Sequence, residues 1–454
     1  MSERPEREIQ VPRGDRMEGF DQDFINRIKT GFKPLFVRNP LTTVYQQLPS
    51  AIYNVKPGDY QPRSLMLGFA WGLHFFLLNN IGLEDLHCSA HMASILSRNP
   101  SITFENYLAA MNGLRREIEA CHLVKPKVDI TNLIVLVLNC CQIIDLLLLF
   151  HEGRLTSEVD RICSSEINTW WVDLLLIMNQ VPFFALQKMY DMVVGDHHNM
   201  AAQQIPSLVD LSLHFFEQFL DLNKDLAPPL ESNSIHHLLH LVHYYLLPQN
   251  NPPPSPPSSK KPSHHIRLIR ESIPSARRLK EVGVRFRAKN DPGFSNITFH
   301  KGVLQLPFLR IDNNTEIILR NMVAWEQCHF NVGGYFTSYC IFMDYLVNAV
   351  EDVHILQNER IIEQRLGSEE QVASLFNGLS TNIAYIAYEN DFLLGLYRDL
   401  NNYCGNRFNL WRAKLLVDYF SSPWAIISVI AAIFLLLMTA IQTFYTAYAY
   451  HRPH

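Results

Sequence analysis

The longest uncharged stretch of this 454-residue chain lies at its C-terminus. No charged side chain occurs between Asp418 and Arg452, and the residues from 423 to 448 are mostly apolar. About 20 apolar residues in a helix suffice to cross the hydrocarbon core of a bilayer. We therefore predict one transmembrane helix over residues 420–449, followed by a short tail of residues 450–454. The alternative, a buried helix at the end of a folded domain, fits the length and the lack of charge less well.

The predicted transmembrane helix carries aromatic residues at both ends, which is typical of membrane interfaces. The residues expected to contact lipid along the span are Trp424, Ile430, Leu436, Ile441 and Tyr445. Membrane lipid is therefore the first partner that the sequence predicts.

Positive charge is distributed unequally on the two sides of this helix. Arg407, Arg412 and Lys414 precede it, whereas only Arg452 follows it. Because segments rich in Lys and Arg remain on the cytoplasmic side of a membrane, we expect the body of the protein to face the cytosol. The predicted location is the plasma membrane or an endomembrane, with a single pass near the C-terminus.

The composition indicates a folded body in a reducing compartment. Apolar residues make up 48% of the chain and charged residues 18%, enough apolar material for a large core. A net charge of −5 lacks the basic surface that a nucleic-acid partner requires. The eight cysteines include no CxxC pair, which favours free buried thiols over disulfides. Residues 1–20 are polar and lack the apolar core of a secretory signal, so we predict a disordered leader there.

Between the termini, the sequence predicts one large, mainly α domain in two halves. Apolar residues recur at helical spacing through residues 21–248 and through most of residues 266–419. Residues 249–265 are rich in proline and serine and cannot pack into a core. We expect this segment to form an extended loop, which could present a polyproline II ligand to a partner.

A change of hydrophobic period predicts a small β element in the second half. Residues 282–287, 297–300 and 303–309 alternate between apolar and other side chains, as strands do. Lys301-Gly302 offers a hairpin turn between the last two segments. We therefore expect a small β-hairpin or sheet of two or three strands, and helices from residue 315 to about residue 398.

Residues 130–150 form a second long apolar stretch. If it crossed a membrane, the protein would be multi-pass. Asn139, Gln142 and Asp145 interrupt the stretch, and an Asp near the middle of a lipid-facing helix is costly. We favour a buried core helix and keep the second span as an alternative.

The apolar helical stretch of residues 166–194 contains a proline. Pro182 is expected to kink or break the helix, because proline lacks the amide proton and clashes with the preceding turn. Asn179 and Gln180 lie just before it, and we expect their amides to hydrogen-bond the backbone groups that the break leaves free.

No residue stands out as catalytic, and we predict neither enzyme activity nor a cofactor. Motifs for phosphate loops, dinucleotides, nucleophile elbows and metalloproteases are absent. His236, His240 and His243 would share one helical face and could bind a metal ion, although the leucines among them favour an ordinary amphipathic helix. The alternative function is an unrecognised enzyme or metal-binding protein that uses this histidine face or Cys328.

Two sequons would be glycosylated only if the body faced the lumen. They begin at Asn296, in Asn-Ile-Thr, and at Asn313, in Asn-Asn-Thr. Such sequons arise often by chance, so they do not decide the orientation.

Several long segments of the chain carry a family resemblance. They are LIMNQVPFFALQKMYD (176–191), IPSARRLKEVGVRF (273–286), ITFHKGVLQLPFLRIDNNTEIILRNMVAWEQC (297–328), TSYCIFMDYLVNAVEDVHIL (337–356), LGSEEQVASLFNGL (366–379) and the C-terminal segment 411–448. Together they resemble one plant family, the domain-of-unknown-function family numbered two-four-seven, over roughly residues 50–450. Tyr60-Gln-Pro62 also follows the family, whereas residues 65–76 and 139–142 depart from it.

The resemblance implies a helical body, a C-terminal membrane anchor, and no established activity or cofactor. Some grass members of the family are candidate pollen determinants of self-incompatibility. We therefore predict a membrane-anchored recognition or signalling protein that acts through protein–protein contact, with an unidentified protein partner. The expected contact surfaces are the leader, the proline-rich loop and the divergent region of residues 60–125.

Overall fold

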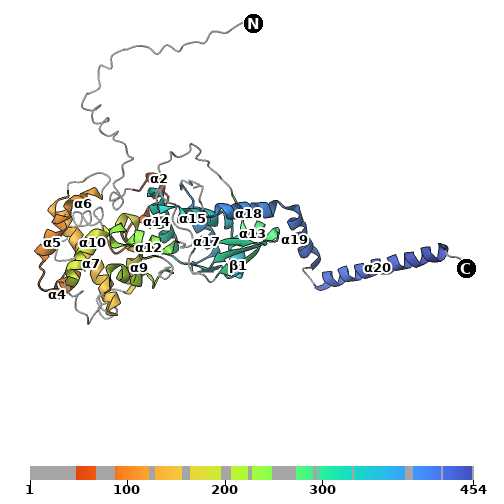
Figure 1. Ribbon diagram of the computed structural model, residues 1–454, viewed down its shortest axis with the longest axis horizontal. Coiled ribbons are helices and arrows are strands. Elements are labelled where there is room, and N and C mark those ends of the chain that lie inside the picture. Colours follow the sequence, from red (N-terminus) through yellow and green to blue (C-terminus); the bar gives the residue numbers. More distant parts are fainter. Residues whose placement is uncertain are drawn as a thin grey trace, which may run out of the picture.

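The computed structural model is mainly α-helical and carries two small sheets in its described residues (Figure 1). The structure describes residues 48–67, 87–121, 128–155, 164–195, 206–222, 228–247, 272–289, 294, 296–329, 332–383, 392–420 and 423–451. The predicted leader (1–20) and the proline-rich loop (249–265) lie outside these ranges. Buried apolar side chains from Leu48 to Leu400 form one cluster, so both halves of the body share a core.

The N-terminal half is built around α7 (Ile130–His151), which is buried along almost its whole length. The other described helices of this half that surround it are α2 (Ser50–Tyr53), α4 (His87–Arg98), α5 (Phe104–Gly113), α6 (Arg115–Ala120), α9 (Ser164–Asp173), α10 (Phe183–Val194) and α11 (Leu208–Phe216). Helices α4, α5, α10 and α11 pack directly against α7. A reciprocal cap begins α7, because the Asp129 and Asn132 side chains each accept the other residue's N–H, at 2.9 and 3.0 Å.

Asp145, the most deeply buried polar residue of α7, is bound by side chains of α4. Asp145 lies 2.8 Å from Nδ1 of His91 and accepts a hydrogen bond from the Ser94 hydroxyl at 2.7 Å. Nε of Arg98 lies 3.6 Å from the same carboxylate. These contacts offset the cost of burying the charge. The prediction that residues 130–150 form a buried core helix is therefore confirmed.

The break expected at Pro182 is also present. Helix α9 ends at Asp173, a 3-10 turn η5 (Ile177–Asn179) follows, and α10 begins directly after Pro182. The Asn179 amide donates to the carbonyls of Leu65 and Asp173, at 2.7 and 2.9 Å. The Gln180 amide donates to two carbonyls of the same break, those of residues 174 and 176. The two buried amides thus satisfy backbone groups that the broken helix leaves free, as predicted.

The C-terminal half packs around α14 (Thr315–Cys328). Its other described helices are α13 (Ala276–Glu281), α15 (Tyr335–Leu346), α16 (Val350–Asn358), α17 (Glu369–Leu379) and α18 (Leu394–Gly405). Helix α12 (Leu238–Leu246), at the end of the N-terminal half, joins them. Helices α12, α15 and α17 contact α14 directly. The carboxylate of Asp312 accepts hydrogen bonds from the backbone N–H groups of Asn314, the N-cap residue of α14, and of Thr315, its first residue, at 2.9 and 3.1 Å. It thereby satisfies an N–H group that the start of the helix leaves free.

The predicted hairpin joins β2 (Thr298–His300) to β3 (Val303–Pro307). Lys301 and Gly302 form its turn with φ angles of 49° and 77°, the left-handed conformation that tight hairpins require. β1 (Arg285–Lys289) pairs with β3 in parallel, which completes a sheet of three strands in the order β1-β3-β2.

A second sheet was not predicted. It consists of β4 (Leu309–Ile311) and β5 (Ile362–Gln364), which pair in parallel. The prediction that residues 315 to about 398 contain helices and no strand is wrong at β5. Three residues are too few to display a period of two, and the pairing partner lies about fifty residues earlier in the chain.

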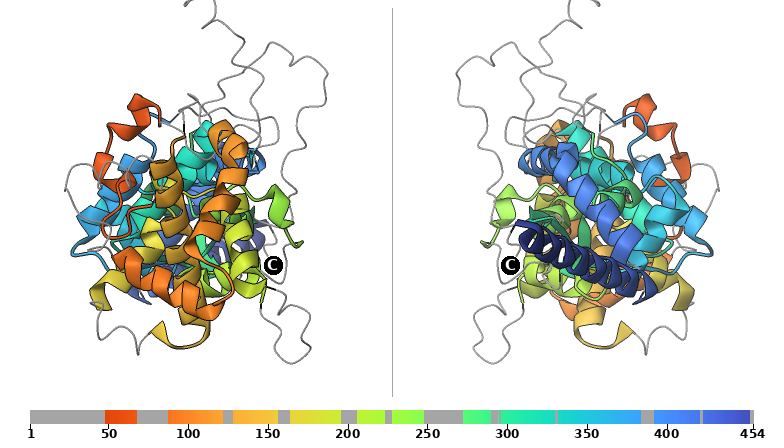
Figure 2. Two further views of the ribbon diagram at one scale, coloured as in Figure 1. Left: turned by 90° about the vertical axis from the view of Figure 1, so that its left-hand side faces the viewer. Right: turned by 90° about the vertical axis from the view of Figure 1, so that its right-hand side faces the viewer.

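Two final helices leave the body at the end opposite to α4 and α5 (Figures 1 and 2). They are α19 (Arg407–Phe420) and α20 (Pro423–His451). Within α20, the stretch Ile427–Tyr448 is long and apolar enough to cross a membrane, and none of it is buried against the body. The predicted span of residues 420–449 therefore begins three residues before the helix and ends two residues short of its last residue.

Candidate functional site

Three buried polar clusters lie along α14, at its first turns, at its last turn and around Trp325.

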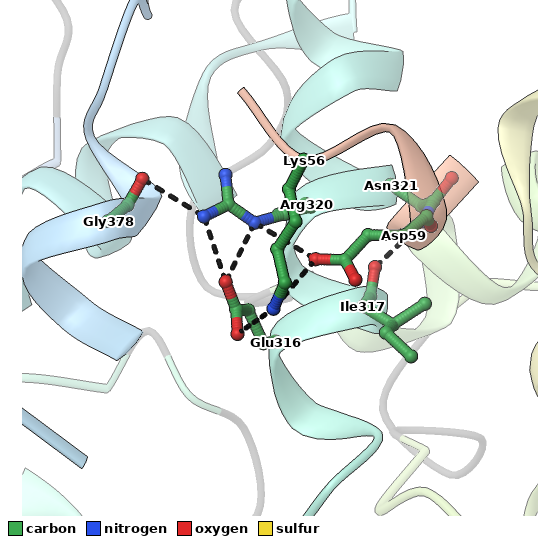
Figure 3. Close-up of polar contacts among 7 residues, drawn as sticks. All are labelled: Lys56, Asp59, Glu316, Ile317, Arg320, Asn321 and Gly378. Atoms are coloured by element: carbon green, nitrogen blue, oxygen red, sulfur yellow. Dashed lines mark hydrogen bonds and ion pairs between the residues drawn. The ribbon is translucent and has the colours of Figure 1, made fainter. Parts of the chain in front are cut away.

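The first cluster joins the N-terminal half to α14 through alternating charges (Figure 3). Arg320 contacts Glu316 at 2.8 Å and Asp59 at 3.2 Å. Lys56 contacts the same two carboxylates, at 2.6 Å for Glu316 and 3.4 Å for Asp59. Arg320 also donates to the Gly378 carbonyl at 3.1 Å and so reaches α17. Two cations and two anions balance, and the cluster ties three distant segments together.

Burial sets the protonation tendencies around this first cluster. Burial raises the pKa of the Asp59 carboxyl, and the Lys56 ammonium offsets part of that rise. Burial likewise raises the pKa of the neighbouring Tyr60 to about 12. Asn321 donates to the Asp59 carbonyl at 2.9 Å and accepts from the Ile177 N–H at 2.9 Å. The cluster therefore acts as a structural joint.

The second cluster centres on Glu326, whose two carboxylate oxygens bind donors from other helices. Nε2 of His243 lies 3.0 Å from Oε1. The backbone N–H groups of Phe336 and Thr337 donate to this carboxylate at 2.9 and 2.7 Å, and the Thr337 hydroxyl donates at 2.8 Å. Because these N–H groups belong to the first turn of α15, Glu326 acts as a cap supplied from another helix.

The third cluster gathers histidines around the indole of Trp325. The rings of His237, His240 and His329 lie with centroids 4.5, 5.5 and 3.7 Å from that of Trp325. Burial lowers the pKa of His237 and His240 well below the usual range, and the neighbouring histidines add to that effect. Both rings are therefore neutral at pH 7.

The three histidines of the metal hypothesis are not brought together. His236 precedes α12, because His237 is its N-cap and accepts the His240 N–H at 3.1 Å. The rings of His236 and His240 are neighbours, at 4.8 Å between centroids, whereas His243 turns away to Glu326. Within the described ranges, no group of three or more His, Cys, Asp or Glu side chains is placed to hold a metal ion.

Cys328, the other residue of the enzyme hypothesis, ends α14 and is 5% exposed. None of the cysteines whose side chains the structure describes forms a disulfide; they are Cys121, Cys140, Cys141, Cys328, Cys340 and Cys404. Burial raises the pKa of Cys121 to about 12 and that of Cys140 also, which disfavours the reactive thiolate.

The two sequons differ in accessibility. Asn296 is half-buried, and its side-chain oxygen accepts a hydrogen bond from the Lys289 ammonium at 2.8 Å. Asn313 is exposed, just before α14. Asn313 is therefore the more accessible of the two in the folded body.

The predicted span residues are all exposed on α20. The exposed fractions of Trp424, Ile430, Leu436, Ile441 and Tyr445 range from 50% to 79%. Side chains of this kind gain free energy when they leave water. The body leaves these side chains uncovered, on a helix that is long and apolar enough to span a membrane.

Sequence reasoning missed the first two clusters as units. The spacing of Glu316 and Arg320 was the available signal for an ion pair on a helix, and Lys56 and Asp59 have a similar spacing. The signals lie about 260 residues apart in the chain, so nothing in the sequence alone connects them.

The fold and these clusters define a mainly helical protein with a shared core and one exposed C-terminal helix that could span a membrane. The chain belongs to the family DUF247, described as a plant protein of unknown function, which matches residues 46–438. The family resemblance drawn from the sequence is thereby confirmed.

Two relatives from Arabidopsis thaliana are similar to this chain. The UPF0481 protein At3g47200 is 26% identical over 434 residues, which cover 87% of this chain and 84% of the relative. The putative UPF0481 protein At3g02645 is 31% identical over 175 residues, or 38% of this chain and 33% of the relative. No solved structure matches the chain.

Proposed function

We propose that this chain is a plant membrane protein that acts in recognition or signalling through protein–protein contact. In this proposal α20 crosses the plasma membrane or an endomembrane once, and the helical body lies on the cytosolic side. The observation that carries it is the uncovered apolar surface of α20, of which no part of Ile427–Tyr448 is buried.

The roles of the polar clusters support contact rather than chemistry. Both oxygens of Glu326 hold the start of α15, and His237 caps α12. The ion cluster of Arg320 joins two halves of the body. These groups hold helices in place, which suits a body that presents a surface to a partner. Pollen recognition in self-incompatibility is the narrower proposal, and it rests on the family resemblance alone.

The test is affinity capture from plant membranes, with the full-length chain and a version that lacks residues 420–454. Mass spectrometry identifies the partners and reports whether Asn296 and Asn313 carry glycans. We expect specific cytosolic partners, unmodified sequons, and loss of the partners when the C-terminal segment is removed. An Asn313→Gln variant controls for the glycan assignment.

Two results contradict parts of this proposal. Glycans on Asn313, with cell-surface or secreted partners, would reverse the orientation of the body. The absence of a stable partner in either form would overturn the recognition proposal and favour an enzyme.

A further inference from the structure

The uncovered apolar surface does not stop at α20. Among the described residues, the large apolar side chains that are exposed all lie in α19 or α20, apart from Ile130 and Phe308. On α19 these residues are Phe408, Trp411 and Leu415, with exposed fractions of 68%, 69% and 51%. Exposed apolar side chains grouped on one helix are unusual on the surface of a soluble protein, and these three lie outside the candidate membrane span.

The spacing of these residues places them on one face of α19. At 3.6 residues per turn, Phe408, Trp411 and Leu415 fall within about 60° of helix surface. Arg407 and Arg412 fall on either side of this apolar stripe. An apolar stripe bordered by basic residues is the pattern of helices that lie in a membrane interface.

The other face of α19 rests on the body. Helices α13 and α18 contact α19, and Leu410 is half-buried. The Asn409 amide donates to the Tyr403 carbonyl at 3.0 Å, and Arg412 donates to the Tyr403 hydroxyl at 3.3 Å. The body therefore fixes which way the apolar stripe faces.

The connection to α20 places the stripe close to any membrane that α20 crosses. Residues 421 and 422 alone separate the two helices. A connection of two residues spans at most about 10 Å between helix ends. Figure 1 shows α19 next to the start of α20. The C-terminal end of α19 must then lie at the headgroup level once α20 is inserted.

We infer that α19 lies along the membrane surface. Phe408, Trp411 and Leu415 enter the boundary between headgroups and acyl chains, and Arg407 and Arg412 contact anionic lipid headgroups. Trp and Arg suit these positions because one is amphipathic and the other pairs with phosphate. This inference rests on the proposed insertion of α20 and adds a second membrane contact, which orients the body instead of leaving it on a free tether.

The test uses the full-length chain in vesicles of phosphatidylcholine with phosphatidylserine, in which the lipids carry bromine near their headgroups. Bromine quenches tryptophan fluorescence on contact. Comparison of the parent with Trp411→Phe isolates the quenching at α19, and Trp424→Phe isolates the quenching at α20. We expect both tryptophans to be quenched by lipid.

Substitutions then identify the contact. Phe408→Glu combined with Leu415→Glu should remove the quenching of Trp411 and leave that of Trp424 unchanged. Asn402→Glu, an exposed position on α18, is the matched control and should change neither. Quenching of Trp411 also reports the ratio of molecules with α19 on the membrane to molecules with α19 off it. Arg407→Gln and Arg412→Gln should each lower this ratio about fivefold in the anionic vesicles and have little effect in phosphatidylcholine alone.

The outcomes separate this inference from the membrane proposal. Quenching of Trp424 without quenching of Trp411 would overturn the inference and leave the anchor standing. Protection of Trp411 from acrylamide without lipid quenching would mean that protein, such as a second copy of the chain, covers the stripe. If neither tryptophan is quenched, both the inference and the anchor are wrong.

Discussion

Helices α7 and α20 are similar in apolar character and opposite in environment. Each contains a stretch of 22 residues that is long and apolar enough to cross a membrane. In α7, 89% of the most apolar window is buried in the body, whereas in α20 none is buried. The amount of apolar sequence therefore does not distinguish a core helix from a candidate span.

The partners of the polar residues do distinguish them. In α7, Asp145 requires groups from another helix, namely His91 and Ser94 of α4. In α20, the hydroxyls of Thr439, Thr443 and Thr446 donate to carbonyls of their own helix, each at 2.8 Å. A helix whose polar groups are satisfied internally can leave the protein, because lipid offers no hydrogen-bonding partner. A helix that buries a carboxylate must stay with the helix that binds it.

The largest effect should come from one acidic residue placed in each helix. Leu147→Asp in α7 buries an unpaired charge, since Leu147 is 0% exposed, and we expect it to destabilise the body by more than about 4 kcal/mol. Leu436→Asp in α20 should leave the body unchanged and weaken membrane insertion by about 3 kcal/mol. Urea unfolding in mild detergent and alkaline extraction of membranes measure the two effects.

Conservative variants control for this comparison. Leu147→Met and Leu436→Met should each cost less than about 1.5 kcal/mol. Equal loss of body stability from both acidic variants would show that α20 packs on the body after all.

A smaller effect should come from pH, and only in the body. Because the folded pKa values of His237 and His240 lie below that of an unfolded histidine, the unfolded state binds more protons below pH 6.5. Stability is therefore full above pH 6.5 and falls as the pH drops. Between pH 7.5 and 5.5 each histidine should lower the free energy of unfolding by up to about 1.4 kcal/mol. Urea unfolding at the two pH values measures this change.

His237→Asn tests the assignment, because asparagine keeps an N-cap for α12 and does not titrate. The variant should lose about half of this pH dependence. If the parent protein loses no stability between pH 7.5 and 5.5, the assignment of this pH dependence to His237 and His240 is wrong. Membrane insertion of α20 should not change, since Ile427–Tyr448 contains no group that titrates in this range.

The smallest effect concerns the carboxylate that holds α7 in the body. Asp145→Asn keeps the shape but weakens the contacts with His91 and Arg98, and we expect a cost of about 1–2 kcal/mol in the free energy of unfolding. Thr439→Val in α20 is the matched change and should alter body stability by less than about 0.5 kcal/mol. If Asp145→Asn is neutral, the contact with α4 is not what retains α7.

The elements predicted best were those with a strong local signal. The uncharged run before Arg452 predicted α20, and Lys301-Gly302 between alternating residues predicted the hairpin of β2 and β3. Pro182 marked the break before α10. In each case the residues that determine the structure are neighbours in the chain, so one sequence is enough.

The features that the sequence could not predict depend on residues far apart. β5 forms because β4 lies beside it, and the pairing leaves no trace in three residues. His243 looked like a partner of His236 on one helical face, but Glu326 of α14 binds it instead. Because α12 begins at Leu238 with His237 as its N-cap, His236 lies outside the helix and not on that face. Such competition between a local pattern and a distant partner appears only in three dimensions.

The joint between Lys56 and Glu316 also has a consequence for biosynthesis. The two residues are separated by 260 positions in the chain. At a synthesis rate of about 5–20 residues per second, roughly 15 to 50 seconds pass between the appearance of one and of the other. During that interval the nascent N-terminal half lacks α14 and exposes the apolar surface that α14 will cover. The protein should therefore depend on chaperones while it is still attached to the ribosome.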